Sequence, residues 1–137
     1  MIYLDTNIII SYMDEKDPNH KTARNFIKSL SREKKLVSQL TIVELASVYS
    51  RGNVSEPQAF AIYSVKEVKA EIINVDFTQA LNEAFRLSHM VKLRTLDLIH
   101  IAICKTQNIE KFSTFDKDII AKKEDLSEIG VKVIEPK

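Results

Sequence analysis

Short apolar runs alternate along this chain with longer stretches in which apolar residues recur every three or four positions. A short apolar run that ends at polar residues is typical of a buried strand, above all in a parallel sheet covered on both faces. We expect strands at residues 2–4, 36–37, 72–75, 112–114 and 131–134.

The stretches between these runs have the periodicity of amphipathic helices. The strongest start signal is Ser55-Glu56-Pro57, because proline favours the first turn of a helix. Residues 96–107 are apolar on most sides, so we expect a central, buried helix there. The predicted helices are residues 8–13, 19–32, 41–49, 57–69, 77–91, 96–107 and 119–123.

Strands that alternate with helices predict the α/β class, in which helices cover a mostly parallel sheet on both faces. We expect a three-layer α/β/α sandwich with a central sheet of four to five strands. Right-handed crossovers would bring the carboxyl ends of these strands to one edge. No repeat, linker or shift in composition divides the chain, so we expect a single domain over residues 1–137.

The composition is that of a globular protein, with 45% hydrophobic and 28% charged residues. The net charge is only +1, so contact with nucleic acid would depend on a local basic patch. The one cysteine, Cys104, lies in an apolar run, which excludes an internal disulfide and predicts a buried thiol rather than a nucleophile. No apolar run is long enough to span a bilayer and no secretory signal is visible, so we expect a cytoplasmic protein.

Four acids follow a predicted strand or open a predicted helix, namely Asp5, Glu44, Asp97 and Asp116. Each has a simpler interpretation, because Thr41 and Glu44 match a capping box and the other three acids suit helix caps. In a parallel sheet, however, Asp5, Glu44 and Asp116 would all reach the carboxyl edge. Asp97 is an acid in a helix that is otherwise suited to burial.

Carboxylates gathered in one cleft repel one another unless a cation compensates their charge. Mg²⁺ or Mn²⁺ bound through oxygen is the expected cation, since three histidines and one cysteine do not suggest a zinc site. Such a cation polarises a phosphodiester and lowers the pKa of a bound water. The acids therefore indicate a phosphoryl-transfer enzyme or a nuclease.

Four segments of the chain resemble the PIN-domain ribonucleases and occur in the order of that family. They are Leu4-Asp5-Thr6-Asn7, Thr41-Ile42-Val43-Glu44, Leu96-Asp97-Leu98-Ile99-His100-Ile101-Ala102 and Ser113-Thr114-Phe115-Asp116-Lys117-Asp118. The small size is similar to that of the VapC toxins of toxin–antitoxin pairs.

By this resemblance, the four acids are the catalytic and metal-binding residues. Thr6, Asn7 and Thr114 would shape the site through hydrogen bonds. Asp118 is a fifth acid that family members vary in using, so it is either an alternative ligand or a neighbour of the ligands. The resemblance also implies an RNA substrate, a cognate antitoxin and a homodimer, with no membrane.

Several other residues have both a functional and a simpler interpretation. His100 lies one turn after Asp97 and is either a general base or a hydrogen-bonded core histidine. Arg94 could reach a phosphate, and Arg24 and Lys28, in a stripe with Arg32, could follow an RNA backbone. The simpler interpretation is that these basic residues are exposed to solvent. The aromatic residues are either a dimer or antitoxin surface or part of the core, and they are Tyr49, Phe60 and Tyr63.

The leading hypothesis is a Mg²⁺- or Mn²⁺-dependent endoribonuclease, the toxin of a type II toxin–antitoxin system. An RNA-processing or decay nuclease outside a toxin pair is the first alternative. A non-catalytic RNA- or protein-binding module on the same fold is the second. A haloacid-dehalogenase-like phosphatase would need a second aspartate at position 7, where this chain has Asn7.

Overall fold

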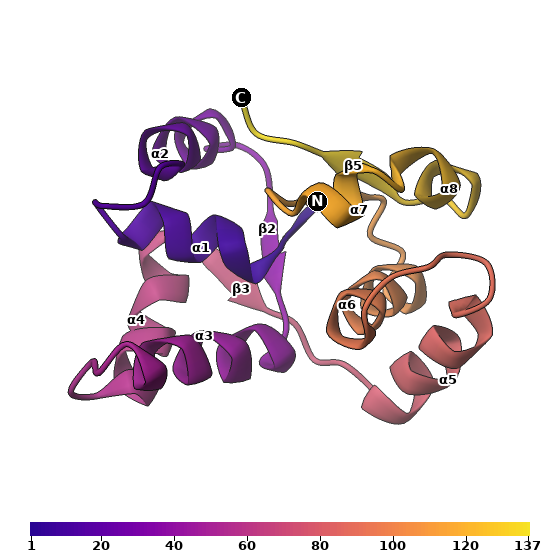
Figure 1. The fold of residues 1–137 in the computed structure, drawn as a ribbon, viewed down its shortest axis with the longest axis horizontal. Coiled ribbons are helices and arrows are strands. Elements are labelled where there is room, and N and C mark those ends of the chain that lie inside the picture. Colours follow the sequence, from indigo (N-terminus) through magenta and orange to yellow (C-terminus); the bar gives the residue numbers. More distant parts are fainter.

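Five parallel strands form one sheet with the order β3-β2-β1-β4-β5 in the computed structural model, which describes residues 1–137 (Figure 1). The strand β1 lies in the centre and pairs with both β2 and β4. The order of the strands therefore reverses direction at β1. The strands are β1 (Ile2–Leu4), β2 (Lys35–Val37), β3 (Ala70–Ile72), β4 (Lys111–Ser113) and β5 (Lys132–Ile134).

Helices cover both faces of the sheet, with α1 to α4 on one side and α5, α6 and α8 on the other (Figure 1). This arrangement confirms the predicted three-layer α/β/α sandwich. No helix is both long and apolar enough to cross a bilayer. The helices are α1 (Thr6–Met13), α2 (His20–Ser29), α3 (Gln39–Arg51), α4 (Pro57–Glu67), α5 (Phe77–Leu87), α6 (Thr95–Thr106), α7 (Lys117–Ile120) and α8 (Lys123–Glu128).

Each face of the sheet has its own apolar core, and β1 contributes to both. Ile2 and Leu4 pack in the core formed with α1, α2, α3 and α4. Tyr3 points to the opposite face and packs in the core formed with α5 and α6. Successive side chains of a strand alternate between faces, so a strand buried on both faces is apolar throughout. This explains the continuous apolar run at the start of the chain.

Several predicted boundaries differ from the structure; for example, the helix predicted at 19–32 ends at Ser29 and the one predicted at 41–49 spans Gln39–Arg51. The third strand spans Ala70–Ile72 rather than 72–75, because this edge strand pairs only with β2 and its register follows that partner. Helix α5 ends at Leu87 rather than at residue 91. The predicted helix at 119–123 is α7, which ends at Ile120 and is followed by the separate helix α8.

Candidate active site

A cavity of about 390 Å³ opens at the carboxyl edge of β1, where the strand order reverses. Ligand sites of open α/β sheets occur at this position. All four acids singled out in the sequence line the cavity, although they come from four separate parts of the chain. We call it the acid cavity; its polar lining includes Asp5, Thr6, Asn7, Glu44, Arg94, Asp97 and Asp116.

Asp5 follows β1 directly and is only 5% exposed. Its Oδ1 atom accepts a hydrogen bond from the backbone N–H of Thr6 at 2.8 Å, so it caps α1 as well as lining the cavity. Its Oδ2 atom accepts hydrogen bonds from Thr114 Oγ1 at 2.7 Å and Asn7 Nδ2 at 3.2 Å. Burial raises the pKa of Asp5 to about 6; His100 and the Thr114 hydrogen bond oppose this effect only in part, and the nearby acids Asp97 and Glu44 add to it.

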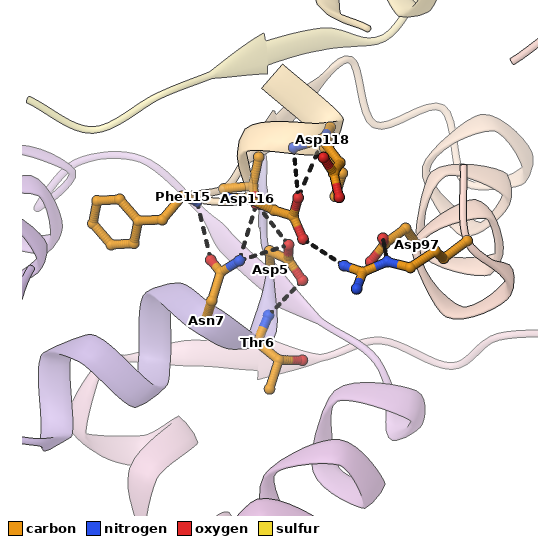
Figure 2. A network of polar contacts seen from close by, with 10 residues as sticks. Asp5, Thr6, Asn7, Asp97, Phe115, Asp116 and Asp118 are labelled. Atoms are coloured by element: carbon orange, nitrogen blue, oxygen red, sulfur yellow. Dashed lines mark hydrogen bonds and ion pairs between the residues drawn. The ribbon is translucent and has the colours of Figure 1, made fainter. Parts of the chain in front are cut away.

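Asn7, in the first turn of α1, points toward the loop that follows β4 (Figure 2), where Thr114 lies. The Asn7 amide donates to Thr114 Oγ1 at 3.1 Å and accepts from the backbone N–H of Phe115 at 3.1 Å. Thr114 Oγ1 in turn accepts from the backbone N–H of Asp116 at 2.9 Å. Both polar side chains therefore hold the loop of Asp116 against Asp5.

Glu44 lies in the second turn of α3, one turn further into the helix than the sequence pattern suggested. The helix begins after Ser38, and its capping box pairs Ser38 with Thr41, so the predicted pairing of Thr41 with Glu44 is wrong. This leaves Glu44 free to face the cavity, where its Oε1 atom accepts from Thr6 Oγ1 at 2.8 Å and contacts His100 Nε2. Burial alone would raise the pKa of Glu44, but the contacts with His100 and Thr6 hold it below its ordinary value.

Asp97 lies in the first turn of α6 and faces Asp116 across the cavity mouth. It does not cap the helix, because α6 begins one residue after Arg94. The Arg94 guanidinium bridges the two acids, with Nε 3.3 Å from Asp97 Oδ2 and Nη2 2.8 Å from Asp116 Oδ2. Burial raises the pKa of Asp97, and the nearby Asp116 adds to this effect, while Arg94 opposes it.

Asp116 caps α7 as the sequence suggested, because its Oδ1 atom accepts from the backbone N–H groups of Asp118 and Ile119 at 2.8 and 3.4 Å. The remaining oxygen, Oδ2, receives the Arg94 contact. Figure 2 shows Asp116 beside Asp5 and Asp118 further along the same loop. Asp118 is exposed and is not part of the cavity lining.

The donor chemistry of the acid cavity fits a hard divalent cation, since four carboxylates line it and no cysteine or histidine side chain does. No three such ligand side chains are arranged closely enough here to surround an ion. The positive charge between Asp97 and Asp116 is supplied instead by Arg94. A cation bound by both acids would have to displace this guanidinium.

The predicted basic residues do not all share this site. Arg94 lines the acid cavity, whereas Arg24 and Lys28 line a different cavity of about 510 Å³ that has no lining residue in common with it. The Arg24 guanidinium lies over the ring of Tyr12, 4.7 Å from its centroid. Arg24 and Lys28 therefore do not line the acid cavity, and their contact with an RNA backbone stays a prediction.

The aromatic residues divide between core and surface. The Tyr49 ring is buried, and its hydroxyl bonds to Ser64 Oγ at 2.7 Å. Tyr63 is half exposed and stacks on Phe60, which in turn packs edge-on against Tyr49. Cys104 is fully buried, as predicted, and its burial raises the pKa of the thiol.

The sequence analysis missed Ser47 and Arg51, which line the cavity, and Tyr3, which lies behind its wall. Its hydroxyl lies 2.8 Å from Nδ1 of His100, which is the buried, hydrogen-bonded histidine of the simpler interpretation. The signal was a tyrosine in an otherwise aliphatic buried strand, since the hydroxyl of a buried tyrosine requires a partner.

The family model of the PIN domain matches residues 2–125 of this chain. No curated protein sequence matches the chain. A solved structure of VapBC2 from Rickettsia felis, bound to a promoter DNA fragment, contains a chain with TM-score 0.70, 17% identity and 100% coverage of both chains.

Two further solved structures share the fold. FitAcB from Neisseria gonorrhoeae gives TM-score 0.67 at 15% identity, covering 98% of this chain and 96% of that one. VapC20 from Mycobacterium tuberculosis, a sarcin-ricin loop cleaving toxin, gives TM-score 0.64 at 18% identity, covering 88% and 94%. At these identities the similarity is one of fold. Because the family model spans nearly the whole chain, this protein belongs to the PIN domain family.

Proposed function

We propose that this protein is a divalent-metal-dependent endoribonuclease that hydrolyses RNA phosphodiester bonds. The observation that supports this most directly is that Asp5, Glu44, Asp97 and Asp116 line one cavity although they come from four separate segments. Chance capping residues would have no reason to converge in this way. The chain belongs to the PIN domain family, and its motifs resemble those of the ribonuclease members of that family. Both points support the same reaction.

In this proposal the four acids are the catalytic and metal-binding residues, and the cofactor is Mg²⁺ or Mn²⁺. When bound, such a cation polarises the phosphodiester and lowers the pKa of a water molecule. Thr6, Asn7 and Thr114 keep Asp5 and the loop of Asp116 in position through the hydrogen bonds described above. Asp118 stays an alternative ligand that would need to turn toward the cavity.

Arg94 has a second role in the proposed reaction. Its guanidinium lies at the cavity mouth and is 70% exposed, so it can leave Asp97 and Asp116 without disturbing the core. A planar guanidinium matches the geometry of two phosphate oxygens. We propose that it then holds the RNA phosphate beside the acids. Arg24 and Lys28 would contact the RNA only at a distance from the reacting group.

We further propose that this chain is the toxin of a type II toxin–antitoxin system, with an antitoxin as its protein partner. Its fold is similar over almost its whole length to chains of VapBC2 and FitAcB and to the toxin VapC20. A homodimer, a single domain over residues 1–137 and a cytoplasmic location are parts of the same proposal. Sedimentation of the purified chain would distinguish a dimer from a monomer.

The nuclease is tested by incubating structured and single-stranded RNAs with the wild type and with Asp97→Asn, in Mg²⁺, Mn²⁺ or EDTA. Asp76→Asn is the matched control, because Asp76 caps α5 outside the acid cavity and asparagine caps a helix equally well. We expect cleavage that needs the cation, persists in Asp76→Asn and is lost in Asp97→Asn. Cleavage by Asp97→Asn at the wild-type rate would contradict the proposal.

Expression in a bacterial host separates the toxin from an RNA-processing nuclease. A toxin should arrest growth when expressed alone and should be neutralised by a small protein encoded beside it. A processing or decay nuclease should cleave RNA in vitro without arresting growth. Arrest that persists in Asp97→Asn would show that the effect does not come from the acid cavity.

A further inference from the structure

We propose that Tyr3 and His100 are positioning residues that orient Glu44 within the acid cavity. The inference rests on the proposed function, because it explains how one of the proposed metal-binding acids is held. The observation is a buried chain of hydrogen bonds that runs from the central strand to the cavity wall. It links Ser38, Tyr3, His100 and Glu44.

The links of this chain come from three elements that are distant in sequence. Tyr3 lies on β1, and its hydroxyl is 2.7 Å from Ser38 Oγ and 2.8 Å from His100 Nδ1. His100 lies on α6, and its Nε2 bonds to Oε1 of Glu44 on α3. Tyr3, Ser38 and His100 are each at most 1% exposed. No solvent therefore competes for these bonds.

The hydrogen-bond network also assigns the donor of each bond. The carboxylate of Glu44 can only accept a hydrogen bond, so the proton of this contact lies on Nε2 of His100. In a neutral imidazole the other nitrogen, Nδ1, then accepts, and its donor is the Tyr3 hydroxyl. The Tyr3 oxygen can in turn accept from Ser38 Oγ. The tautomer therefore matches Glu44 on one side of the ring and Tyr3 on the other.

As a consequence, the two carboxylate oxygens of Glu44 differ in their hydrogen bonds. His100 and Thr6 both bond to Oε1, while Oε2 has no hydrogen-bond partner. One oxygen is therefore anchored and the other remains available as a ligand. Groups that orient a metal-binding carboxylate in this way typically change metal affinity or activity by about 10- to 100-fold when they are removed.

His100 acts through Glu44 rather than on the substrate. Both ring nitrogens are hydrogen-bonded, the side chain is 1% exposed, and it does not line the acid cavity. A histidine with a purely structural role would not need a carboxylate of the cavity as its acceptor. Asp97 lies one turn before His100, so α6 carries one proposed ligand and supports a second.

The test compares Tyr3→Phe with Tyr49→Phe. Both tyrosines are buried, and both hydroxyls lie 2.7 Å from a serine Oγ, but only Tyr3 is connected to Glu44. Phenylalanine keeps the stacking of position 3 on Phe112. The measurements are Mn²⁺ affinity by calorimetry and, separately, kcat and KM for an RNA that the wild type cleaves.

We expect Tyr3→Phe to bind Mn²⁺ about tenfold more weakly and to lower kcat while KM for RNA is unchanged. Tyr49→Phe should match the wild type in both, because the hydroxyl that it removes bonds to Ser64 and not to the chain that ends at Glu44. Equal Mn²⁺ affinity in the two variants, with wild-type kcat for Tyr3→Phe, would overturn the inference.

A second pair of variants tests the imidazole itself. The amide of His100→Gln can still donate to Glu44, whereas His100→Leu fills similar space without a donor. We expect His100→Gln to restore most of the Mn²⁺ affinity that His100→Leu loses. Wild-type affinity in a folded His100→Leu would overturn the inference. Failure of the wild type to bind Mn²⁺ or to cleave RNA would instead reject the proposed function, and the positioning role with it.

Discussion

Asp5 shows how one residue serves the fold and the site at the same time. It caps α1, accepts a hydrogen bond from Thr114 in the loop after β4, and is buried at the carboxyl edge of the central strand. A buried carboxylate is costly in its charged form unless enough partners compensate it. The hydrogen bonds of Asp5 compensate only in part, so the metal-free protein carries a penalty at neutral pH that a bound cation would remove.

The first prediction concerns this penalty. The pKa of Asp5 is about 6 in the folded protein and 3.8 without the fold, so protonation favours the folded state. In EDTA, stability should therefore rise as pH falls from 7 to 5, by on the order of 1 kcal/mol from this group. Protonation of Glu44 lowers the stability of the folded state, but only at lower pH, because its pKa is held below 4.5.

Urea unfolding of the wild type and Asp5→Asn at both pH values measures the effect. The free energy of unfolding should rise less between pH 7 and pH 5 in Asp5→Asn than in the wild type. The difference is the contribution of the Asp5 carboxyl. The same pH dependence in both proteins would show that Asp5 is not destabilised by its charge.

The second prediction concerns Arg94, whose guanidinium supplies the positive charge between Asp97 and Asp116. Arg94→Gln should bind Mn²⁺ more tightly, by about two- to fivefold, because a competing cation is gone. It should also bind RNA more weakly, if the guanidinium holds a phosphate.

Arg86→Gln is the matched control, since Arg86 is exposed and pairs with Glu83 at the same i,i+3 spacing on a different helix. Calorimetry with Mn²⁺ should find this control equal to the wild type. Equal Mn²⁺ affinity for Arg94→Gln and wild type would mean that the guanidinium does not compete for the acids.

At the scale of elements, the start of α3 determines where Glu44 lies. Ser38 caps the helix and pairs with Thr41, which places Glu44 in the second turn, facing the cavity. The sequence contains two overlapping cap patterns here, one starting at Ser38 and one at Thr41. The Ser38 pattern prevails because Ser38 directly follows β2 at a buried position and also bonds to Tyr3.

The third prediction follows from this cap. Ser38→Ala should destabilise the protein by about 1 to 2 kcal/mol, because the helix loses its cap and the Tyr3 hydroxyl loses a buried partner. Ser50→Ala, at an exposed position of the same helix, should change stability by less than about 0.5 kcal/mol. Urea unfolding at pH 7 measures both. An equal, small effect of the two substitutions would contradict the assigned cap.

Sequence periodicity predicted most elements but not all of their ends. Strand β1 is buried along its whole length, carries a clear apolar run and was predicted with its observed bounds. The edge strand β3 is partly exposed to solvent, and Ile72 is 45% exposed. Its bounds therefore follow from its pairing with β2 and not from an apolar pattern of its own. Helix α8 is short and mostly exposed, which leaves almost no periodic signal.

At the scale of the whole molecule, the acid cavity couples the two halves of the sheet. Asp5 and Glu44 come from the part of the chain before β3, whereas Asp97 and Asp116 come after it. A cation that binds all of them would add a link between segments that are already joined by the pairing of β1 with β4 and by the hydrogen bonds of Asp5 and Tyr3. Metal binding should therefore stabilise the entire fold rather than one loop.

The fourth prediction is that Mn²⁺ at about 100 times its dissociation constant raises the free energy of unfolding by about 3 kcal/mol. Thermal unfolding with Mn²⁺ or EDTA measures this as a rise in Tm. The rise should be much smaller in Asp97→Asn and unchanged in Asp76→Asn. Equal shifts in all three proteins would indicate that the ion binds elsewhere.

The sequence by itself determined the class of fold and the list of candidate acids. Both follow from local signals, namely apolar runs, helical spacing and acids placed just beyond them. It could not decide between a cap and a ligand for any one acid, because both interpretations require the same residue at the same local position. Asp5 and Asp116 are in fact caps that also line the cavity.

Only the tertiary structure decided which residues meet. The central place of β1 brings Asp5 next to the loop after β4, more than a hundred residues away, and the packing of α6 against that sheet brings His100 to Tyr3 and Glu44. It also sends Arg24 and Lys28 to another cavity and leaves Arg94 between two acids. Such contacts depend on strand order and helix packing, which are set by interactions across the whole chain and not by its local pattern.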